Sequence, residues 1–330
     1  MHFSAVRSRV LPNTPRAATI GATLASSELK ASDLGAVAIV VLIWGLNFVV
    51  MKLGLAHFTP FQLGAGRFVF AFLPLALVLR QPGTSPRWML AFGLAQGLGQ
   101  FGLLFVALRI GMTAALASVL LQTQVFFSAA LGVLLLGEAV GKPLLAGMAF
   151  AAVGLACFAA NVAMSPSGGA VTGWGLVLTL GSAAFWAVSN IVVRKAQQGA
   201  GRFNATAFVA WSSAVPILPF AAMSWWFDPP GAQENWVRAP WQGWLVLMFL
   251  GWIATNLGYG LWTGLLKKFP AAQVAPFSLG VPVIGLLAGI LLLGEPVAPL
   301  QWIGVAFVLC ALLCVLLGPR LVRKAADAGA

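Results

Sequence analysis

The pentapeptide LLLGE occurs twice in this 330-residue chain, at residues 134–138 and again at residues 291–295. An offset of 157 residues aligns 114–157 with 271–314 without a gap, and fourteen of the aligned positions are identical. Glycine and alanine identities are common in apolar sequence, but an uninterrupted identity of five residues that includes a charge is not. We therefore interpret the chain as two related halves.

The sequence around both copies is apolar and long enough to cross a membrane. The chain is 60% hydrophobic and 8% charged, its mean hydropathy is +0.95, and such a composition is not that of a water-soluble fold. A helical span needs about 20 apolar residues. Ten such stretches occur, at residues 34–51, 60–79, 88–108, 113–136, 143–163, 172–193, 206–227, 241–265, 271–293 and 299–317. With no alternating strand pattern, the sequence predicts an all-α integral membrane protein with ten transmembrane helices.

The basic residues predict how these spans are oriented. Counted along the ten spans, one side of the membrane carries fifteen Lys and Arg residues, the other side carries three, and Arg67 lies within a span. An excess of Lys and Arg marks the cytoplasmic side, so both termini are expected to be cytoplasmic. The formal net charge of +12 is therefore a topology signal, and we expect no nucleic-acid partner.

The number of spans between the two copies predicts that the halves are inverted. The first copy ends span 4 and the second ends span 9, so equivalent sequence crosses the membrane in opposite directions. A weaker match of residues 44–52 with 186–195 aligns Asn47 with Asn190. Two inverted five-helix repeats with a site near the bilayer midplane are typical of secondary transporters.

The expected organisation is a disordered basic tail, a first repeat, a linker, a second repeat and a cytoplasmic tail, at residues 1–33, 34–164, 165–171, 172–318 and 319–330. The first segment lacks the apolar core of a signal peptide, and an over-extended start is the alternative to a real tail. Three cysteines within spans and two histidines form no disulfide or metal pattern. We expect no cofactor and no metal.

Uncharged polar and aromatic side chains within the spans are the candidates for substrate binding, because polar groups at this depth usually face the bundle interior or a wet cavity. Gln96 and Gln100 are four residues apart and share a helix face. Gln122 and Gln124 are two apart, so at most one of them should face a given cavity. The predicted set is Trp44, Asn47, Gln96, Gln100, Gln122, Gln124, Trp186, Asn190, Asn256, Tyr259 and Ser278.

Amide and indole groups of this kind suit a small zwitterion, because they form hydrogen bonds without imposing a net charge. The same side chains also bond one helix to another in membranes, and this structural alternative stays open for each of them.

A second group of residues is assigned to gating or structure: Arg67, Glu138, Pro276, Pro282 and Glu295. Arg67 could bind a substrate carboxylate or could reach toward the interface and brace backbone carbonyls, and from sequence we favour the structural role. The two glutamates end spans 4 and 9, which favours gating contacts or helix-end hydrogen bonds. The two prolines should bend span 9, whereas span 4 has no proline at the matching positions.

The chain from about residue 34 to 320 resembles the EamA family of the drug/metabolite transporter superfamily. The resemblance rests on the segments WGLNFVVMKLGL (44–55), RFVFAFLPL (67–75), GMTAALASVLLQTQVFFSAALGVLLLGE (111–138) and APFSLGVPVIGLLAGILLLGE (275–295). Within the family it is most similar to bacterial exporters of O-acetylserine and cysteine, on FWAVSNIVVRK (185–195), WSSAVPILPF (211–220) and GYGLW (258–262).

The resemblance implies an inner-membrane exporter of small neutral amino acids or cysteine-pathway metabolites that works by alternating access, with membrane lipid as its surroundings. The alternatives are a transporter of the same fold for drugs, nucleotide-sugar-like molecules or lipid-linked cargo and, more distantly, an integral-membrane enzyme. No catalytic constellation favours an enzyme. Oligomeric state and coupling ion are left open.

Overall fold

The computed structural model describes residues 29–136, 141–164, 171–198, 203–269 and 271–328, and all regular structure within these ranges is helical. Ten helical segments there are long and apolar enough to cross a membrane. They coincide with the ten stretches expected from hydropathy, so the predicted all-α membrane architecture is confirmed.

Five of the ten spans are single α-helices: α2 (Ala31–Gly54), α3 (Pro60–Val78), α8 (Lys142–Met164), α9 (Gly173–Gln198) and α17 (Pro299–Ala328). α2 begins three residues before the expected start of span 1. α17 continues through most of the segment that was expected to be a C-terminal tail.

The other five spans are interrupted. Span 3 is α4 (Pro86–Phe92), η1 (Gly93–Phe101) and α5 (Gly102–Ile110), and span 4 is α6 (Ala114–Leu120), η2 (Leu121–Thr123) and α7 (Gln124–Leu136). Span 7 is α10 (Ala205–Ser212) and α11 (Ile217–Phe227); span 8 is α13 (Trp241–Met248), η4 (Phe249–Leu257) and α14 (Gly258–Lys268). Span 9 is α15 (Ala271–Val274), η5 (Ala275–Leu279) and α16 (Gly280–Leu293), and the short η3 (Ala232–Glu234) and α12 (Asn235–Arg238) precede span 8.

The interruptions fall at matching places in the two halves. η1 and η4, in the third span of each half, are both π-helices of nine residues. η2 and η5, in the fourth span of each half, are both 3₁₀-helices, and the 157-residue offset places 121–123 on 278–280. Span 4 contains its 3₁₀ segment without a proline. The 3₁₀ segment that span 9 shares with it therefore does not require Pro276 or Pro282.

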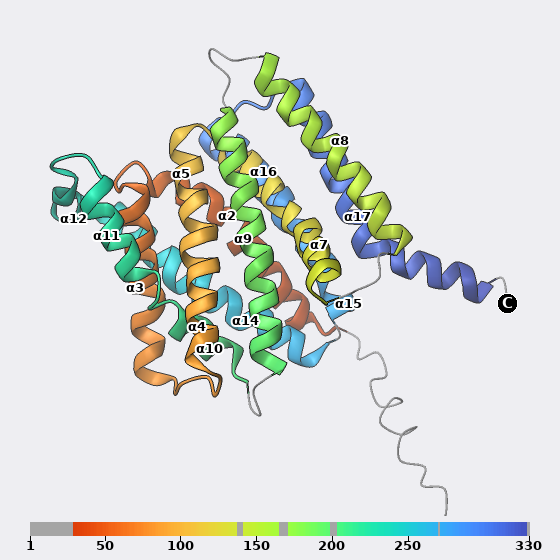
Figure 1. Cartoon of the computed structure of the whole chain (residues 1–330), viewed down its shortest axis with the longest axis horizontal. Helices are drawn as coiled ribbons and strands as arrows, with labels where there is room; N and C mark the ends of the chain where they lie inside the picture. Colours follow the sequence, from red (N-terminus) through yellow and green to blue (C-terminus); the bar gives the residue numbers. More distant parts are fainter. Residues whose placement is uncertain (1–28, 137–140, 165–170, 199–202, 270, 329–330) are drawn as a thin grey trace, which may run out of the picture.

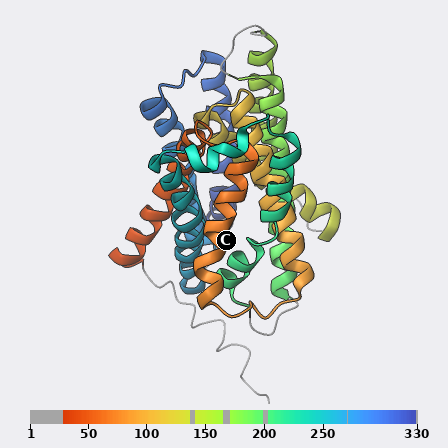
Figure 2. The same cartoon turned by 90° about the vertical axis from the view of Figure 1, so that its left-hand side faces the viewer.

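The spans form one bundle whose helices run vertically or obliquely in the view of Figure 1, and Figure 2 shows the same bundle from the side. α8 and α17 pack against each other along one side of the bundle, and α16 lies against both α2 and α6. Glycines permit the second contact: a Cβ on Gly285 would lie 2.4 Å from the Cβ of Ser118, and one on Gly289 would lie 2.6 Å from the backbone nitrogen of Ala115. At the α6–α16 contact, span 4 and span 9 therefore pack closely enough for their backbones to approach each other.

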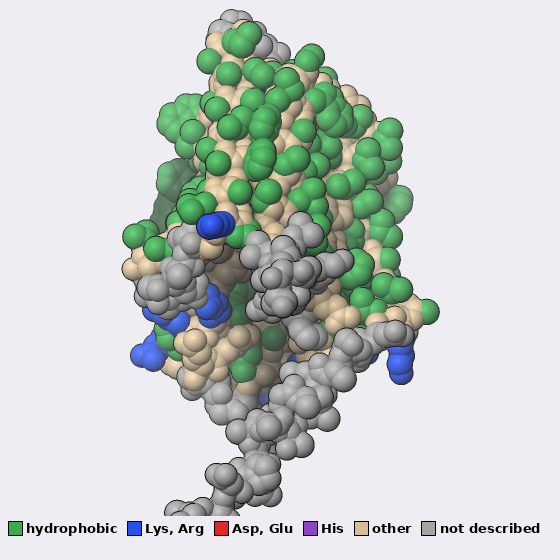
Figure 3. Space-filling model, turned by 90° about the vertical axis from the view of Figure 1, so that its right-hand side faces the viewer, with side chains coloured by type: hydrophobic (Ala, Val, Ile, Leu, Met, Phe, Trp, Pro, Cys, Tyr) green, Lys and Arg blue, Asp and Glu red, His purple; other side chains and the backbone are tan. Residues whose placement is uncertain are grey.

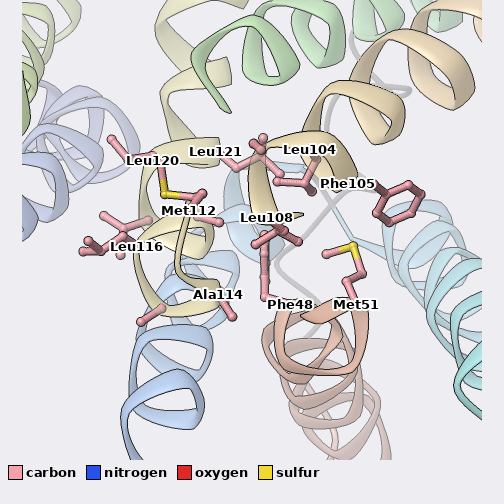
Figure 4. Packing of buried hydrophobic residues seen from close by; sticks show 14 of the residues in the cluster. Phe48, Met51, Leu104, Phe105, Leu108, Met112, Ala114, Leu116, Leu120 and Leu121 are labelled. Atoms are coloured by element: carbon pink, nitrogen blue, oxygen red, sulfur yellow. The ribbon is translucent and has the colours of Figure 1, made fainter. Parts of the chain in front are cut away.

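Buried hydrophobic side chains gather where α2, α5 and α6 meet (Figure 4). Leu104, Leu108, Met112 and Leu116 are fully buried there, beside Met51 of α2. We call the end of the bundle that carries the turn at residues 111–113, between α5 and α6, the α5–α6 end. Gly111 in that turn has a φ of +121°, a conformation that few other residues tolerate.

The outer surface matches a membrane environment. The face in Figure 3 is covered with hydrophobic side chains over most of its height, and the Lys and Arg side chains visible on it lie toward the lower end. Long apolar side chains such as Leu77, Leu134 and Leu218 are more than three-quarters exposed. In water such a surface would aggregate, so these side chains are placed to contact lipid.

Candidate functional site

A cavity of about 280 Å³ lies at the centre of the bundle. Helices of spans 1, 2, 3, 4, 6, 8, 9 and 10 contribute to its wall, so both halves of the chain form it. The cavity brings together nine of the eleven predicted substrate-binding residues: Trp44, Asn47, Gln100, Gln122, Gln124, Trp186, Asn190, Tyr259 and Ser278. Arg67 also lines it, and among the described residues no acidic side chain does.

Amide side chains from spans 4 and 6 form a linked group on one wall. The Asn190 Nδ2 donates to Gln124 Oε1 at 2.9 Å and to Ser128 Oγ at 3.4 Å. Ser128 Oγ in turn donates to Gln124 Oε1 at 3.4 Å. These bonds fix the amides of Gln124 and Asn190. Gln122 also lines the cavity, but its side chain makes no hydrogen bond within the described part of the chain.

The expectation that Gln122 and Gln124 could not face one cavity is wrong. Both line it, because the 3₁₀-helix at 121–123 ends between them. Residues two apart point about 160° away from each other in an α-helix but only about 120° in a 3₁₀-helix, which has 3.0 residues per turn. Two long glutamine side chains can then reach the same space.

Aromatic rings form another part of the cavity wall. The Trp44 ring lies 5.3 Å from the Tyr259 ring and 5.6 Å from the Trp262 ring, measured between centroids. The Trp44 indole donates to the carbonyl of Ala254 at 3.0 Å, and Gly258 lets the ring approach, since a Cβ there would lie 2.5 Å from the indole nitrogen. We call Trp44, Tyr259 and Trp262 the aromatic wall.

Gln96 and Asn256 lie outside the cavity. The Gln96 Nε2 donates to the Tyr259 hydroxyl at 3.1 Å, and its Oε1 accepts from Ser189 Oγ. This amide therefore holds Tyr259 of the aromatic wall without lining the cavity itself. The Asn256 Nδ2 donates to the Ala71 carbonyl at 3.0 Å, which bonds span 8 to span 2. For these two amides the geometry is that of helix-to-helix contact.

Arg67 is 2% exposed and lies beside the cavity. Its guanidinium carbon lies 3.7 Å from the centroid of the Phe101 ring, and its Nη2 donates to Thr255 Oγ1 at 3.2 Å. Its Nη1 lies 3.8 Å from the sulfur of Met51. No carboxylate in the described part of the chain pairs with it.

Two charged side chains hold the α5–α6 turn from both sides. Glu295 accepts from the backbone N–H groups of Ala114 and Ala115, at 2.8 Å through Oε1 and 2.8 Å through Oε2. Lys52 donates to the carbonyls of Leu108 at 2.5 Å and Met112 at 3.0 Å. We call this arrangement the Lys52–Glu295 clamp; it places an anion at a helix N-terminus and a cation at a helix C-terminus, as the helix dipoles favour.

The backbone near the clamp explains how Glu295 reaches span 4. Gly294 ends α16 in the left-handed conformation, with a φ of +64°, and so turns the chain back toward α6. The equivalent Glu138 lies outside the described residues. Pro282 is buried in the first turn of α16 and its carbonyl accepts from Ser118 Oγ at 3.3 Å, whereas Pro276 is the second residue of the 3₁₀ segment η5.

Sequence reasoning missed two kinds of residue. Apolar lining residues such as Phe48, Met51 and Leu312 look like any other residue of a span. Lys52 carried one usable signal, its alignment with Lys195 in the weaker repeat, but nothing in the sequence indicated that it holds the α5–α6 turn.

Comparison with known proteins agrees with this architecture. The model of the EamA-like transporter family matches residues 33–160 and again residues 173–317. A probable amino-acid metabolite efflux pump of Salmonella typhimurium is 37% identical over 294 residues, 88% of this chain and 97% of the relative. A protein of the same description from Escherichia coli is 37% identical over 292 residues, 88% of this chain and 96% of the relative.

A solved crystal structure matches with a TM-score of 0.58 at 19% identity, covering 89% of this chain and 99% of the other. At that identity the match concerns the fold alone. The two family matches span most of the chain and include almost the whole cavity wall, and the chain thus belongs to the EamA-like transporter family.

Proposed function

We propose that this multi-pass membrane transporter exports a small neutral amino acid or an amino-acid metabolite, of which cysteine and O-acetylserine are the first candidates. The observation that carries the proposal is the central cavity, whose wall of amides and aromatic rings contains no described acidic side chain. The relatives described as amino-acid metabolite efflux pumps support the same class of cargo.

The size of the cavity agrees with such a cargo. A cavity of about 280 Å³ lies at the small end of ligand pockets, which measure about 300–1,000 Å³, and this favours a small cargo. A nucleotide sugar or a lipid-linked sugar is several times larger. A small apolar drug would leave the amide of Gln122, which has no side-chain hydrogen bond to the described part of the chain, without a polar partner, and this is unfavourable in a buried site.

The nine cavity residues are proposed to contact the cargo, and Gln96 and Asn256 to act on it indirectly through Tyr259 and through the packing of span 8. In this arrangement the amide groups can accept hydrogen bonds from the cargo and donate hydrogen bonds to it, and the aromatic rings contact it. Pro276 and Pro282 are proposed to set the shape of span 9 beside Ser278.

Alternating access between two inverted halves is proposed as the mechanism. The repeated LLLGE, the five spans that separate its copies, and the matching π and 3₁₀ segments in spans 3, 8, 4 and 9 support the inversion. The boundaries proposed for the halves stay at 34–164 and 172–318, with the cytoplasmic side given by the excess of Lys and Arg and a bacterial inner membrane as the location.

In that orientation the α5–α6 end is periplasmic, and the Lys52–Glu295 clamp closes the cavity on that side. The buried core of α2, α5 and α6 lies between the cavity and this end. Lining residues Trp262, Ser278 and Leu316 lie on the opposite, cytoplasmic side of the cavity by their place in spans 8, 9 and 10. We infer that the structure represents a conformation closed to the periplasm.

The proposal is tested by producing the protein in a bacterium and measuring growth under toxic concentrations of cysteine, O-acetylserine and a panel of other amino acids and analogues. Tolerance to one or more amino acids, with lower intracellular and higher extracellular concentrations of that compound, is the expected result. Tolerance only to drugs or to larger cargo would refute the proposed substrate class.

A cavity variant and a matched surface variant complete the experiment. Gln122→Ala removes an amide that lines the cavity and makes no side-chain hydrogen bond to the described part of the chain. Glu234→Gln changes an exposed side chain of similar size. Tolerance should fall with the first variant and persist with the second at equal amounts of protein in the membrane.

A further inference from the structure

Arg67 is a buried cation whose counter-ion the described chain does not supply. Its side chain is 2% exposed, and the ion pairs among the described residues join Arg238 to Glu234 and Lys268 to Asp33, both away from it. Removing a charge from water is expensive unless it is paired. A cation kept at this depth of a membrane span therefore indicates an anion that arrives from elsewhere.

The guanidinium of Arg67 is held in one position, and several of its N–H groups have no hydrogen-bond partner. It stacks on the Phe101 ring at 3.7 Å, and one Nη donates to Thr255 Oγ1 at 3.2 Å, where Thr255 is itself fixed by a 2.8 Å bond to the Leu250 carbonyl. The other Nη has the sulfur of Met51 at 3.8 Å, a weak acceptor, and Nε has no partner. Of the five N–H groups of a guanidinium, three are therefore unused.

Other groups that line the cavity together with Arg67 suit a positive charge. The aromatic wall offers three ring faces, which attract cations, and its members line the same cavity. Asn47 Oδ1 and Gln100 Oε1 are buried acceptors without a hydrogen-bond partner. Asn47 lies close to Arg67, because its Nδ2 is 3.9 Å from the Met51 sulfur that Arg67 also contacts.

We propose that Arg67 binds the carboxylate of the transported molecule and that the aromatic wall, with the oxygens of Asn47 and Gln100, receives its ammonium group. This inference rests on the proposed function and narrows it: the cargo must carry a free carboxylate. A planar guanidinium forms two parallel hydrogen bonds to a carboxylate, which a lysine cannot reproduce. The geometry thus reverses the preference for a structural role that the sequence alone favoured.

A cation without a neighbouring acid also sets the charge of the cargo. A neutral or anionic amino acid gains from Arg67, whereas an amine, an amide or an ester brings only its positive charge toward an uncompensated guanidinium. Diamino acids, which carry a second positive charge, are disfavoured for the same reason. Selection would therefore depend on the carboxylate more than on the side chain.

The test is counterflow in liposomes that contain the purified full-length protein, with radiolabelled L-cysteine kept reduced as the probe. Unlabelled L-cysteine, L-cysteinamide, L-cysteine methyl ester and cysteamine are compared as competitors. L-cysteine should compete at least about tenfold more effectively than the three compounds that lack the carboxylate, the loss expected for a charge-assisted hydrogen bond. Equal competition by L-cysteinamide would overturn the role of Arg67 while leaving amino-acid transport in place.

Variants give a second readout, with thermal unfolding in detergent as the check on folding. Arg67→Gln should lower the apparent affinity for L-cysteine about tenfold or more and remove the preference over L-cysteinamide, while Arg67→Lys recovers only part of it. Arg238→Gln, at an arginine with a side-chain exposure of 78%, is the matched control and should behave as the wild type. A folded Arg67→Gln variant that keeps the full preference would refute the proposal, and failure of the wild type to move any amino acid would instead refute the proposed function.

Discussion

Replacing Glu295 tests whether the Lys52–Glu295 clamp keeps the transporter closed at the α5–α6 end. Each carboxylate oxygen accepts one backbone N–H at 2.8 Å, from Ala114 and Ala115. A hydrogen bond to a charged group contributes about 1.5–3 kcal/mol net when well buried. Both bonds are only partly buried. We therefore take about 2–3 kcal/mol for the two bonds together, which is about 1–1.5 kcal/mol for each bond, at or just below the low end of the range for one bond.

If these bonds exist only in the closed conformation, Glu295→Ala should shift the balance between closed and open by about 30- to 150-fold, at 1.4 kcal/mol per factor of ten. Glu295→Gln keeps one acceptor oxygen and should give an intermediate shift. Neither variant removes a side chain that lines the cavity, so substrate selectivity should be retained.

The assay is labelling of an introduced cysteine by a membrane-impermeant maleimide applied from the periplasmic side. Leu108→Cys serves as the reporter, because Leu108 is fully buried in α5 (Figure 4) and its carbonyl accepts from Lys52 of the clamp. The three native cysteines, Cys157, Cys310 and Cys314, are first replaced by alanine. Labelling should be slow with Glu295 present and much faster in the alanine variant, with Glu234→Gln as the control. Unchanged labelling in a folded Glu295→Ala protein would refute the view that this contact holds the periplasmic side closed.

Two further predictions follow from packing and hydrogen bonds. Gln100→Ala should reduce transport with little loss of thermal stability, because Gln100 lines the cavity. Asn256→Ala should instead lower the free energy of unfolding by about 0.6–2 kcal/mol, because it loses the hydrogen bond to the Ala71 carbonyl. Unfolding and counterflow measured on both variants separate the two effects, and the opposite pattern would contradict the assignment. Gly285→Ala should destabilise the protein by about 1–3 kcal/mol, since the added Cβ would lie 2.4 Å from Ser118; an unchanged unfolding midpoint would show that α6 and α16 separate without cost.

The spans could be predicted because hydropathy is a property of whole segments and tolerates local error. All ten were found, and their ends differ from the structure by a few residues. The positions of single side chains were harder. Gln122 and Gln124 were separated on the assumption of a continuous α-helix, and the 3₁₀ segment between them changes which way each points.

Depth alone also did not distinguish cavity residues from helix-to-helix contacts. Gln96 and Gln100 have the same sequence signal, but only Gln100 lines the cavity, while Gln96 bonds to Tyr259 and Ser189. The difference depends on which neighbour lies within about 3 Å, and that is decided by tertiary packing. Glu295 was expected at a gate or a helix end; its partners, the N–H groups of Ala114 and Ala115, could not be named without the fold.

The paired π-helices of spans 3 and 8 bear on the history of the chain. A π turn holds one more residue than an α turn, and such a widening is rare enough that two independent origins at corresponding places are improbable. η1 and η4 are both nine residues long, and their starts are 156 residues apart, one fewer than the offset that aligns the two LLLGE copies. We propose that both π-helices descend from one helix of an ancestral five-helix unit; the extra residue then preceded the duplication of its gene, and the one-residue difference entered one copy afterwards, between its third span and its LLLGE.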